Sequence, residues 1–189
     1  MIGLYLGICA IVSYFIGNVN WAIIISHAQK KDIRSMGSGN PGTLNMSRNL
    51  GLKFGLLTFF LDIMKGAVPC LVVFFIFRGQ KFPDSEFYIS DLAIYLCGFS
   101  AVIGHIYPVI YKFKGGKGIA STIGVMIVCE SVHGIGWASV IIMALVAAVV
   151  FIYFTEFGAM GSFIAITPPA ISGSIRLLLD YQEYTDTAT

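Results

Sequence analysis

Apolar runs long enough to cross a lipid bilayer constrain the fold of this chain more than any other feature. About 20 apolar residues in a helix span the hydrocarbon core, because all backbone polar groups then bond within the helix. Apolar residues make up 57% of the 189 residues and the mean hydropathy is +0.82, whereas a soluble domain has roughly 45–50% apolar residues. The sequence therefore predicts an all-α, polytopic integral membrane helix bundle that forms a single domain over 1–189. We expect about six spans, near residues 2–25, 52–77, 92–110, 119–129, 136–154 and 157–179.

Clusters of positive charge between these runs predict the orientation of the bundle. Residues 26–53 carry five Lys and Arg residues against one Asp, and residues 112–117 carry three Lys residues. By the positive-inside rule, both segments face the cytoplasm and the N-terminus lies outside. No Lys or Arg precedes the first run, so we expect it to remain as a membrane helix rather than to be removed as a signal peptide.

Two of the segments between runs combine glycine with polar and cationic residues. Residues 37–48 read Gly-Ser-Gly-Asn-Pro-Gly-Thr-Leu-Asn-Met-Ser-Arg, and residues 112–118 read Lys-Phe-Lys-Gly-Gly-Lys-Gly. Glycine lets the backbone approach a ligand closely, hydroxyl and amide groups add hydrogen bonds, and Arg48 adds a two-pronged positive charge. Because both lie on one predicted face of the membrane, the pair favours a phosphate site over turns that only touch lipid head groups.

The same segments fail as soluble nucleotide-binding motifs. Residues 37–42 match G-x-G-x-x-G, but charged residues precede them and a membrane helix follows, in place of a βαβ unit. Residues 111–118 lack the first Gly and the final hydroxyl residue of a P-loop. The chain has no H-E-x-x-H motif and its four Cys residues are widely spaced. We therefore expect no metal, no cofactor, no disulfide and no nucleic-acid partner.

Ionisable residues inside the apolar runs need partners, because a charge at the centre of the bilayer costs at least about 2.5 kcal/mol. Asp62 and Lys65 stand three positions apart on one face of the second run. They form a structural ion pair, or Lys65 faces the anion site; the residues alone favour neither reading. His105, near the end of the third run, is either a packing residue or a general base. The last run should break or kink at Pro168-Pro169, and the polar residues after Asp180 should be disordered.

Five short motifs follow one another along residues 1–165: Asp32-Ile-Arg34, the segment 37–48, Asp62-Ile-Met-Lys-Gly66, Gly104-His-Ile-Tyr-Pro108 and Phe113-Lys-Gly-Gly-Lys-Gly-Ile-Ala120. Together they resemble the bacterial PlsY family of acyl-phosphate glycerol-3-phosphate acyltransferases. The resemblance implies a multi-pass enzyme of the bacterial inner membrane, with its site loops in the cytoplasm. Such an enzyme moves a fatty acyl group from acyl phosphate to glycerol 3-phosphate, giving lysophosphatidic acid and phosphate for phospholipid synthesis. Its partners are these two substrates and membrane lipids, without a cofactor.

The resemblance also assigns site residues at the matching positions. Catalysis would involve Ser38, Arg48 and Lys117, with either His105 or a phosphate oxygen of the substrate as the base. A third family motif maps onto Gly161-Ser162, although Thr155-Glu156-Phe157 replace the basic residue expected upstream. Substrate binding would involve Gly37, Gly39, Asn40, Gly42, Asn45, Lys65, Lys114, Gly115, Gly116, Gly118 and Ser162.

The C-terminal region departs most from the family pattern. Family members usually continue into a seventh span with a basic His-x-x-Asn segment, which is thought to complete the phosphate site. Neither feature follows Ser162 here. We therefore expect a shortened or diverged member with weak phosphate affinity and reduced or absent turnover. Two alternatives stay open: a small phosphate or glycerol-phosphate transporter with Asp62 and Lys65 along its pathway, and a non-catalytic paralogue.

Overall fold

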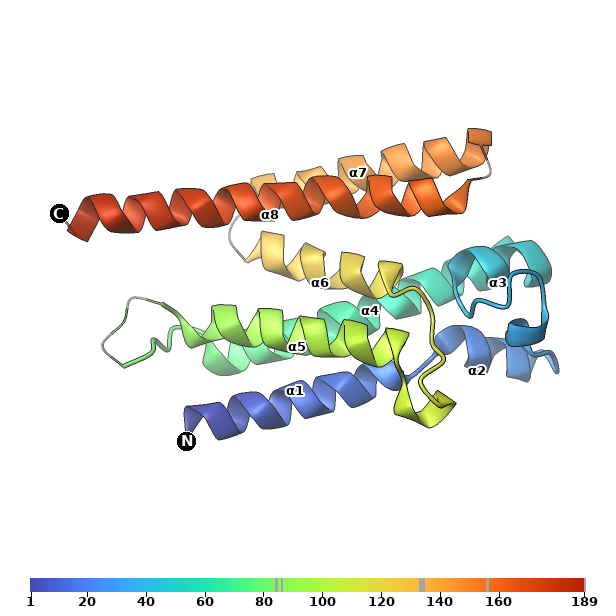
Figure 1. Cartoon of the computed structure of the whole chain (residues 1–189), viewed down its shortest axis with the longest axis horizontal. Coiled ribbons are helices and arrows are strands. Elements are labelled where there is room, and N and C mark those ends of the chain that lie inside the picture. The colour runs from blue at the N-terminus through green and yellow to red at the C-terminus, as the bar shows by residue number, and fades with distance from the viewer. Residues whose placement is uncertain (84, 86, 133–134, 156, 189) are drawn as a thin grey trace. The chain divides into compact units, whose positions relative to one another are not determined.

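The structure, a computed structural model, describes residues 1–83, 85, 87–132, 135–155 and 157–188, and helices joined by loops make up its fold. Within these ranges the one β feature is an isolated bridge between Lys81 and Tyr88. The predicted all-α class is confirmed. In chain order (Figure 1), the helices are α1 Ile2–Asn18, α2 Trp21–Ala28, η1 Ile33–Ser35, α3 Thr43–Leu50, α4 Leu52–Phe77, α5 Ile89–Ile106, η2 Val109–Tyr111, α6 Ile119–Ser131, α7 Ile135–Thr155 and α8 Gly158–Ala188.

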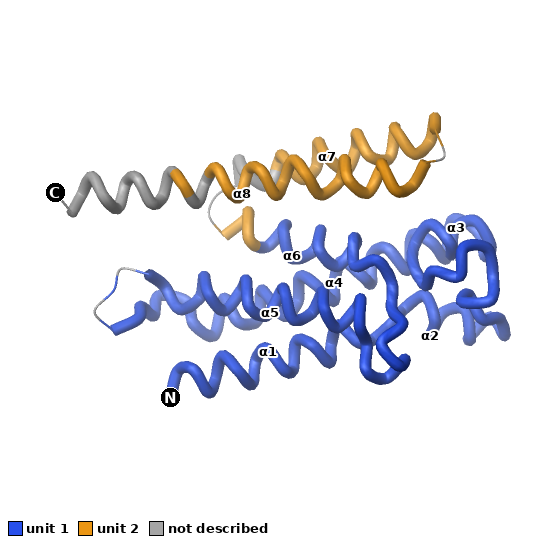
Figure 2. The backbone as a smooth tube through the Cα atoms, in the orientation of Figure 1, with its two compact units in different colours: residues 1–128 blue, residues 129–189 orange. Residues whose placement is uncertain are grey.

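The chain divides into two compact units (Figure 2). Unit 1 covers Met1–Val128 and contains both glycine-rich segments, and unit 2 covers Cys129–Thr189. Within unit 2, α7 packs along α8. The single domain expected from the sequence stays a prediction.

Three stretches of unit 1 are long and apolar enough to cross a membrane: Ile2–Ala28, Leu52–Phe77 and Ile89–Tyr111. Two shorter apolar helices follow at Ile119–Ser131 and Ser139–Thr155. Large apolar side chains point outward along the long helices; Phe75 is 65% exposed and Phe99 is 67% exposed. Outward apolar faces of this kind suit contact with lipid rather than water.

Helices α1, α4 and α5 pack together at the centre of unit 1. A side chain on Gly17 of α1 would collide with the Ala101 carbonyl of α5, and one on Gly104 of α5 would collide with the Tyr14 carbonyl of α1. The two helices therefore touch backbone to backbone, as small residues allow in membrane bundles. This contact fixes the end of α5, from which the second glycine-rich segment emerges.

The first apolar run, predicted as one span over 2–25, is divided into two helices at Val19 and Asn20. The Asn20 side chain accepts a hydrogen bond of 3.1 Å from the Ile23 N–H and so caps α2. That N–H would otherwise bond to the Val19 carbonyl, four residues earlier in a continuous helix. The Val19 carbonyl instead accepts a bond of 2.7 Å from Lys65 Nζ of α4. The two helices together still form one candidate span, Ile2–Ala28, and the break inside it, which Lys65 of another helix satisfies, was not predicted.

A small core next to α2 holds the first glycine-rich segment in place. Ala22 and Ile23 of α2 are buried with Ile33 of η1 and Met46 of α3. Helix α3 has only eight residues, too few for a stable helix on its own in water. Its position therefore depends on this apolar contact.

Pro168 and Pro169 both lie inside α8, which continues past them. Of the two predicted outcomes, the break is wrong and the kink stays a prediction. A membrane helix tolerates the missing N–H groups where neighbouring groups satisfy the freed carbonyls. The disorder predicted after Asp180 was also wrong, because α8 extends to Ala188. Residues 176–188 contain no Gly or Pro to end it.

We predict that Lys65→Met lowers the stability of unit 1 strongly. The change leaves the buried Asp62 carboxylate without its cation and the Val19 carbonyl without its donor, and breaking a buried ion pair costs about 3–5 kcal/mol. Thermal unfolding in detergent measures the effect, with Lys53→Met at the exposed start of α4 as the control. The double variant Asp62→Asn/Lys65→Met should recover part of the loss. Equal melting temperatures for Lys65→Met and Lys53→Met would contradict the role given to this pair.

Candidate functional site

Asn45 shapes the first glycine-rich segment. Its side chain is almost fully buried, and its Nδ2 donates to the carbonyls of Ile33 at 3.1 Å and Met36 at 3.0 Å. Its Oδ1 accepts from the Ser38 N–H at 3.1 Å and from Asn49 Nδ2 at 2.9 Å. One amide therefore ties the segment before α3 to α3 itself. Both N–H groups of the Asn45 amide already donate to carbonyls of the protein. Direct contact of Asn45 with substrate stays a prediction.

The glycines of this segment allow a turn that other residues would strain. Gly37 has φ +54° and Gly39 has φ +70°, in the left-handed region. A side chain on Gly37 would also collide with the Asn45 and Asn49 amides. Ser38, between the two glycines, is exposed, and its Oγ lies 3.4 Å from the Asn40 N–H that donates to it.

The segment predicted as one loop over 37–48 ends in a helix. Helix α3 begins after Gly42, its N-cap, and ends at Leu50, before the C-cap residue Gly51, which has φ +101°. Asn45 and Arg48 therefore lie on α3, with Arg48 exposed in its last turn. No Gly or Pro lies between Thr43 and Leu50, so the pattern there is compatible with a helix.

The second glycine-rich segment folds back along the end of α5. The Gly115 N–H donates to the Ile106 carbonyl at 3.1 Å, and the Gly116 N–H donates to the His105 carbonyl at 3.2 Å. These two N–H groups, predicted to bind phosphate, are therefore engaged within the protein. Lys114 and Lys117 are exposed, and Gly118, with φ +80°, immediately precedes α6.

Both segments meet at Gly116. A side chain there would lie 3.0 Å from the Pro41 carbonyl of the first segment and would collide with Nε2 of His105. The structure thus brings together two segments that are about 70 residues apart in the sequence. Each leads directly into the first turn of a helix, α3 or α6. The N–H groups of a first helical turn have no partner within their own helix, and together with Lys117 they favour an anion at this place.

A row of ionisable side chains lies buried behind Gly116. His105 Nδ1 is 3.8 Å from Asp62 Oδ1, which is 3.0 Å from Lys65 Nζ. All three side chains are almost fully buried, so they support the loops rather than line their surface. For Asp62 and Lys65 the contacts match the structural ion pair. Roles for His105 as a base and for Lys65 as a substrate ligand stay predictions.

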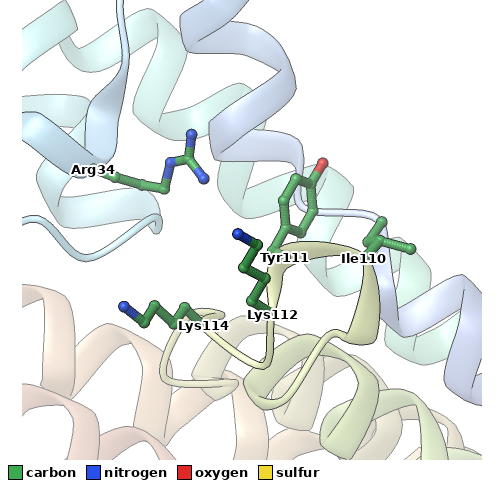
Figure 3. Close-up of a pocket in the computed structure, with 5 residues that line it drawn as sticks. All are labelled: Arg34, Ile110, Tyr111, Lys112 and Lys114. Carbon is green, nitrogen blue, oxygen red and sulfur yellow. The ribbon is translucent and has the colours of Figure 1, made fainter.

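A pocket of about 280 Å³ opens beside the second segment (Figure 3). It is lined by Arg34, Ile110, Tyr111, Lys112 and Lys114. Of these residues only Lys114 was a predicted site residue. Arg34 and Lys112 were visible as basic residues in the sequence, but nothing there indicated that they share a pocket.

Asp32 holds one wall of this pocket in place. Its carboxylate accepts two bonds of 2.9 Å from the Arg34 guanidinium, and its Oδ1 also accepts from the Arg34 N–H at 3.0 Å. The side-chain hydrogen bond from Arg34 is the main reason that the pKa of Asp32 falls to about 2, and the same bond raises the pKa of Arg34. Both groups therefore stay charged across the physiological pH range.

Ser162 lies in unit 2, where its hydroxyl donates to the Gly158 carbonyl at 2.7 Å. Its part in the site stays a prediction. Among the residues that the structure describes, no group of three or more His, Cys, Asp or Glu side chains is placed to hold a metal ion.

Comparison with known proteins gives one consistent family. A family model described as glycerol-3-phosphate acyltransferase matches residues 7–179. The glycerol-3-phosphate acyltransferase of Finegoldia magna is 37% identical to this chain. The alignment covers 94% of this chain and 81% of that relative. That of Mycoplasmopsis pulmonis is 41% identical over 74% of this chain, which spans only 55% of that relative.

The fold also matches a solved protein. The crystal structure of PlsY, an integral membrane glycerol 3-phosphate acyltransferase, in its glycerol 3-phosphate form has a TM-score of 0.72 and 28% identity, covering 93% of this chain and 78% of that one. Its lysophosphatidic acid form has a TM-score of 0.58 and 27% identity, covering 93% of this chain and 92% of that one. Together with the apolar helices, this match confirms the predicted membrane-protein class.

We predict that Asn45→Ala loosens the first glycine-rich segment. The change removes bonds to Ile33, Met36 and Ser38, and each hydrogen bond contributes about 0.5–1.5 kcal/mol. Hydrogen exchange at the Ser38 amide should therefore speed up by at least about tenfold. Asn49→Ala is the matched control, because it removes an amide bonded to Asn45 without cutting these three bonds. Equal exchange at Ser38 in the two variants would show that Asn45 does not hold the segment.

Proposed function

The chain belongs to the glycerol-3-phosphate acyltransferase family, and we propose that it transfers a fatty acyl group from an acyl phosphate to glycerol 3-phosphate. A glycerol hydroxyl attacks the acyl carbonyl, the bond from that carbon to the phosphate oxygen breaks, and the hydroxyl proton is lost. The products are lysophosphatidic acid and inorganic phosphate. The observation that carries the proposal is the meeting of two cationic, glycine-rich segments at Gly116.

A different observation supports each of the two proposed substrates. The solved relative has a glycerol 3-phosphate form and a lysophosphatidic acid form, and the proposal extends both ligands to this chain. Acyl phosphate as donor rests on the sequence motifs shared with the PlsY family. The basic segments at 26–53 and 112–117 support a site on the cytoplasmic side of the bacterial cell membrane.

An acyl phosphate is already an activated mixed anhydride, so the protein mainly has to hold two phosphates together and align the reacting atoms. Arg48 and Lys117 provide positive charge against the repulsion between the phosphates. The first turns of α3 and α6 provide N–H groups for a phosphate or for the oxyanion of the tetrahedral intermediate. A phosphate oxygen of the substrate or His105 takes the proton.

The anion-transporter alternative gains no support from the contacts. Its pathway would require Asp62 and Lys65 to face a passage, but both are almost fully buried. They pair with each other, and Lys65 also donates to the Val19 carbonyl. The acyltransferase proposal therefore stands as the better account of the same residues.

The direct test uses the purified chain in lipid with radiolabelled glycerol 3-phosphate and acyl phosphate. We expect labelled lysophosphatidic acid, and no product when acyl coenzyme A replaces acyl phosphate. Absence of product with both donors, in protein that still binds glycerol 3-phosphate, would favour the non-catalytic paralogue. Product from acyl coenzyme A alone would contradict the proposed donor.

We predict that Arg48→Ala and Lys117→Ala each lower kcat/KM by roughly tenfold or more, because a charge-assisted hydrogen bond contributes about 1.5–3 kcal/mol. Both residues are exposed, so membrane insertion should not change. Lys117→Arg should also lose activity, since a planar fork does not replace a compact ammonium group. Lys53→Ala is the control for general loss of positive charge. Near-normal kinetics in Lys117→Ala would refute the assignment of this site.

A further inference from the structure

A pocket is lined by Arg34, Ile110, Tyr111, Lys112 and Lys114. Of these residues only Lys114 was predicted to bind substrate, and the charges assigned to the reacting phosphates are those of Arg48 and Lys117. The pocket has three cations, and Asp32, bonded to Arg34, offsets only part of their charge. Figure 3 shows the Lys112 ammonium and the Arg34 guanidinium directed toward the same space. A volume of about 280 Å³ is large enough for a small charged group with several oxygens.

The turn that carries the two lysines is built rigidly. The Phe113 N–H donates to the Pro108 carbonyl at 2.9 Å, and the Lys114 N–H donates to the Tyr111 carbonyl at 3.1 Å. Lys112, between Tyr111 and Phe113, has φ 54° and ψ 41°, a left-handed conformation. The turn is also attached to α1, because the Val109 N–H donates to the Tyr14 hydroxyl at 3.2 Å. The backbone that carries the lysines is therefore ordered before any ligand binds, which lowers the entropy cost of binding.

The pocket also has an apolar side, and this limits the kinds of ligand that it could bind. Ile110 is 57% exposed and Tyr111 carries an aromatic ring, so cations and apolar surface share one pocket. The candidate span Ile89–Tyr111 ends here, and Arg34 follows shortly after the candidate span Ile2–Ala28. Cations placed just beyond the ends of membrane helices attract the anionic head groups of lipids.

We propose that this pocket binds a phosphate group at the membrane surface and that a lipid head group carries it. Arg34 and Lys112 hold the phosphate oxygens, Lys114 adds charge, and Ile110 contacts the first carbons of the lipid. The site is separate from the reacting phosphates at Lys117. The proposal does not depend on acyl transfer, because binding is measured without an acyl donor.

Native mass spectrometry of the whole protein in detergent tests the proposal by titration with dioctanoyl phosphatidylglycerol. Lys112→Asn keeps a residue that tolerates the left-handed conformation but removes the charge. It should raise the apparent Kd about five- to tenfold, as expected for one lost charge-assisted bond at an open site. Arg34→Gln should act similarly, and Lys112→Arg should stay within about twofold of the wild type because it retains a cation that phosphate binds.

Two controls separate this pocket from general charge and from the reaction site. Lys53→Asn and Lys117→Ala should both keep lipid affinity within about twofold of the wild type. If either lowers it as much as Lys112→Asn, the pocket is not a separate lipid site. A parallel titration with glycerol 3-phosphate distinguishes the source of the phosphate: an effect of Lys112→Asn there, with lipid binding unchanged, would overturn the lipid assignment. No effect in either titration would overturn the site altogether.

Discussion

The bond from Lys65 to the Val19 carbonyl is the contact on which the rest of unit 1 depends. It satisfies the break between α1 and α2, while Asp62 balances the charge of the same lysine. The break lets the chain turn toward α3 and carry the first glycine-rich segment. On its other side Asp62 lies near His105, whose ring packs against Gly116 of the second segment. One buried ion pair thus connects the membrane helices to both parts of the candidate site.

Glycine serves a different structural purpose in each of the two glycine-rich segments. In the first segment, Gly37 and Gly39 adopt left-handed conformations that allow the turn held by Asn45. In the second, Gly116 is small enough to fit between His105 and the Pro41 carbonyl. The N–H groups of Gly115 and Gly116 are bonded to α5. Positive charge and the first turns of α3 and α6 are therefore left to attract the phosphates.

Features set by local sequence were predicted well from the residues alone. The apolar runs, the glycine-rich segments and the family resemblance all depend on neighbouring residues, and the helical fold and the family match confirm the class and the family. The break at Val19 was missed because its partner, Lys65, is 46 residues away. The pocket was missed for the same reason, since Arg34 and Lys112 meet only in the folded chain. The extension of α8 past Asp180 was missed because polarity was taken as a sign of disorder in residues that have no helix breaker.

Kinetics of Gly116→Ala test most directly the claim that the two segments form one site. The added methyl group must displace His105 or the Pro41 carbonyl, whereas Gly7→Ala on α1 meets nothing within 4 Å. If the account is right, Gly116→Ala raises KM for glycerol 3-phosphate and lowers kcat, and Gly7→Ala leaves both unchanged. Wild-type values of KM and kcat in Gly116→Ala would contradict it.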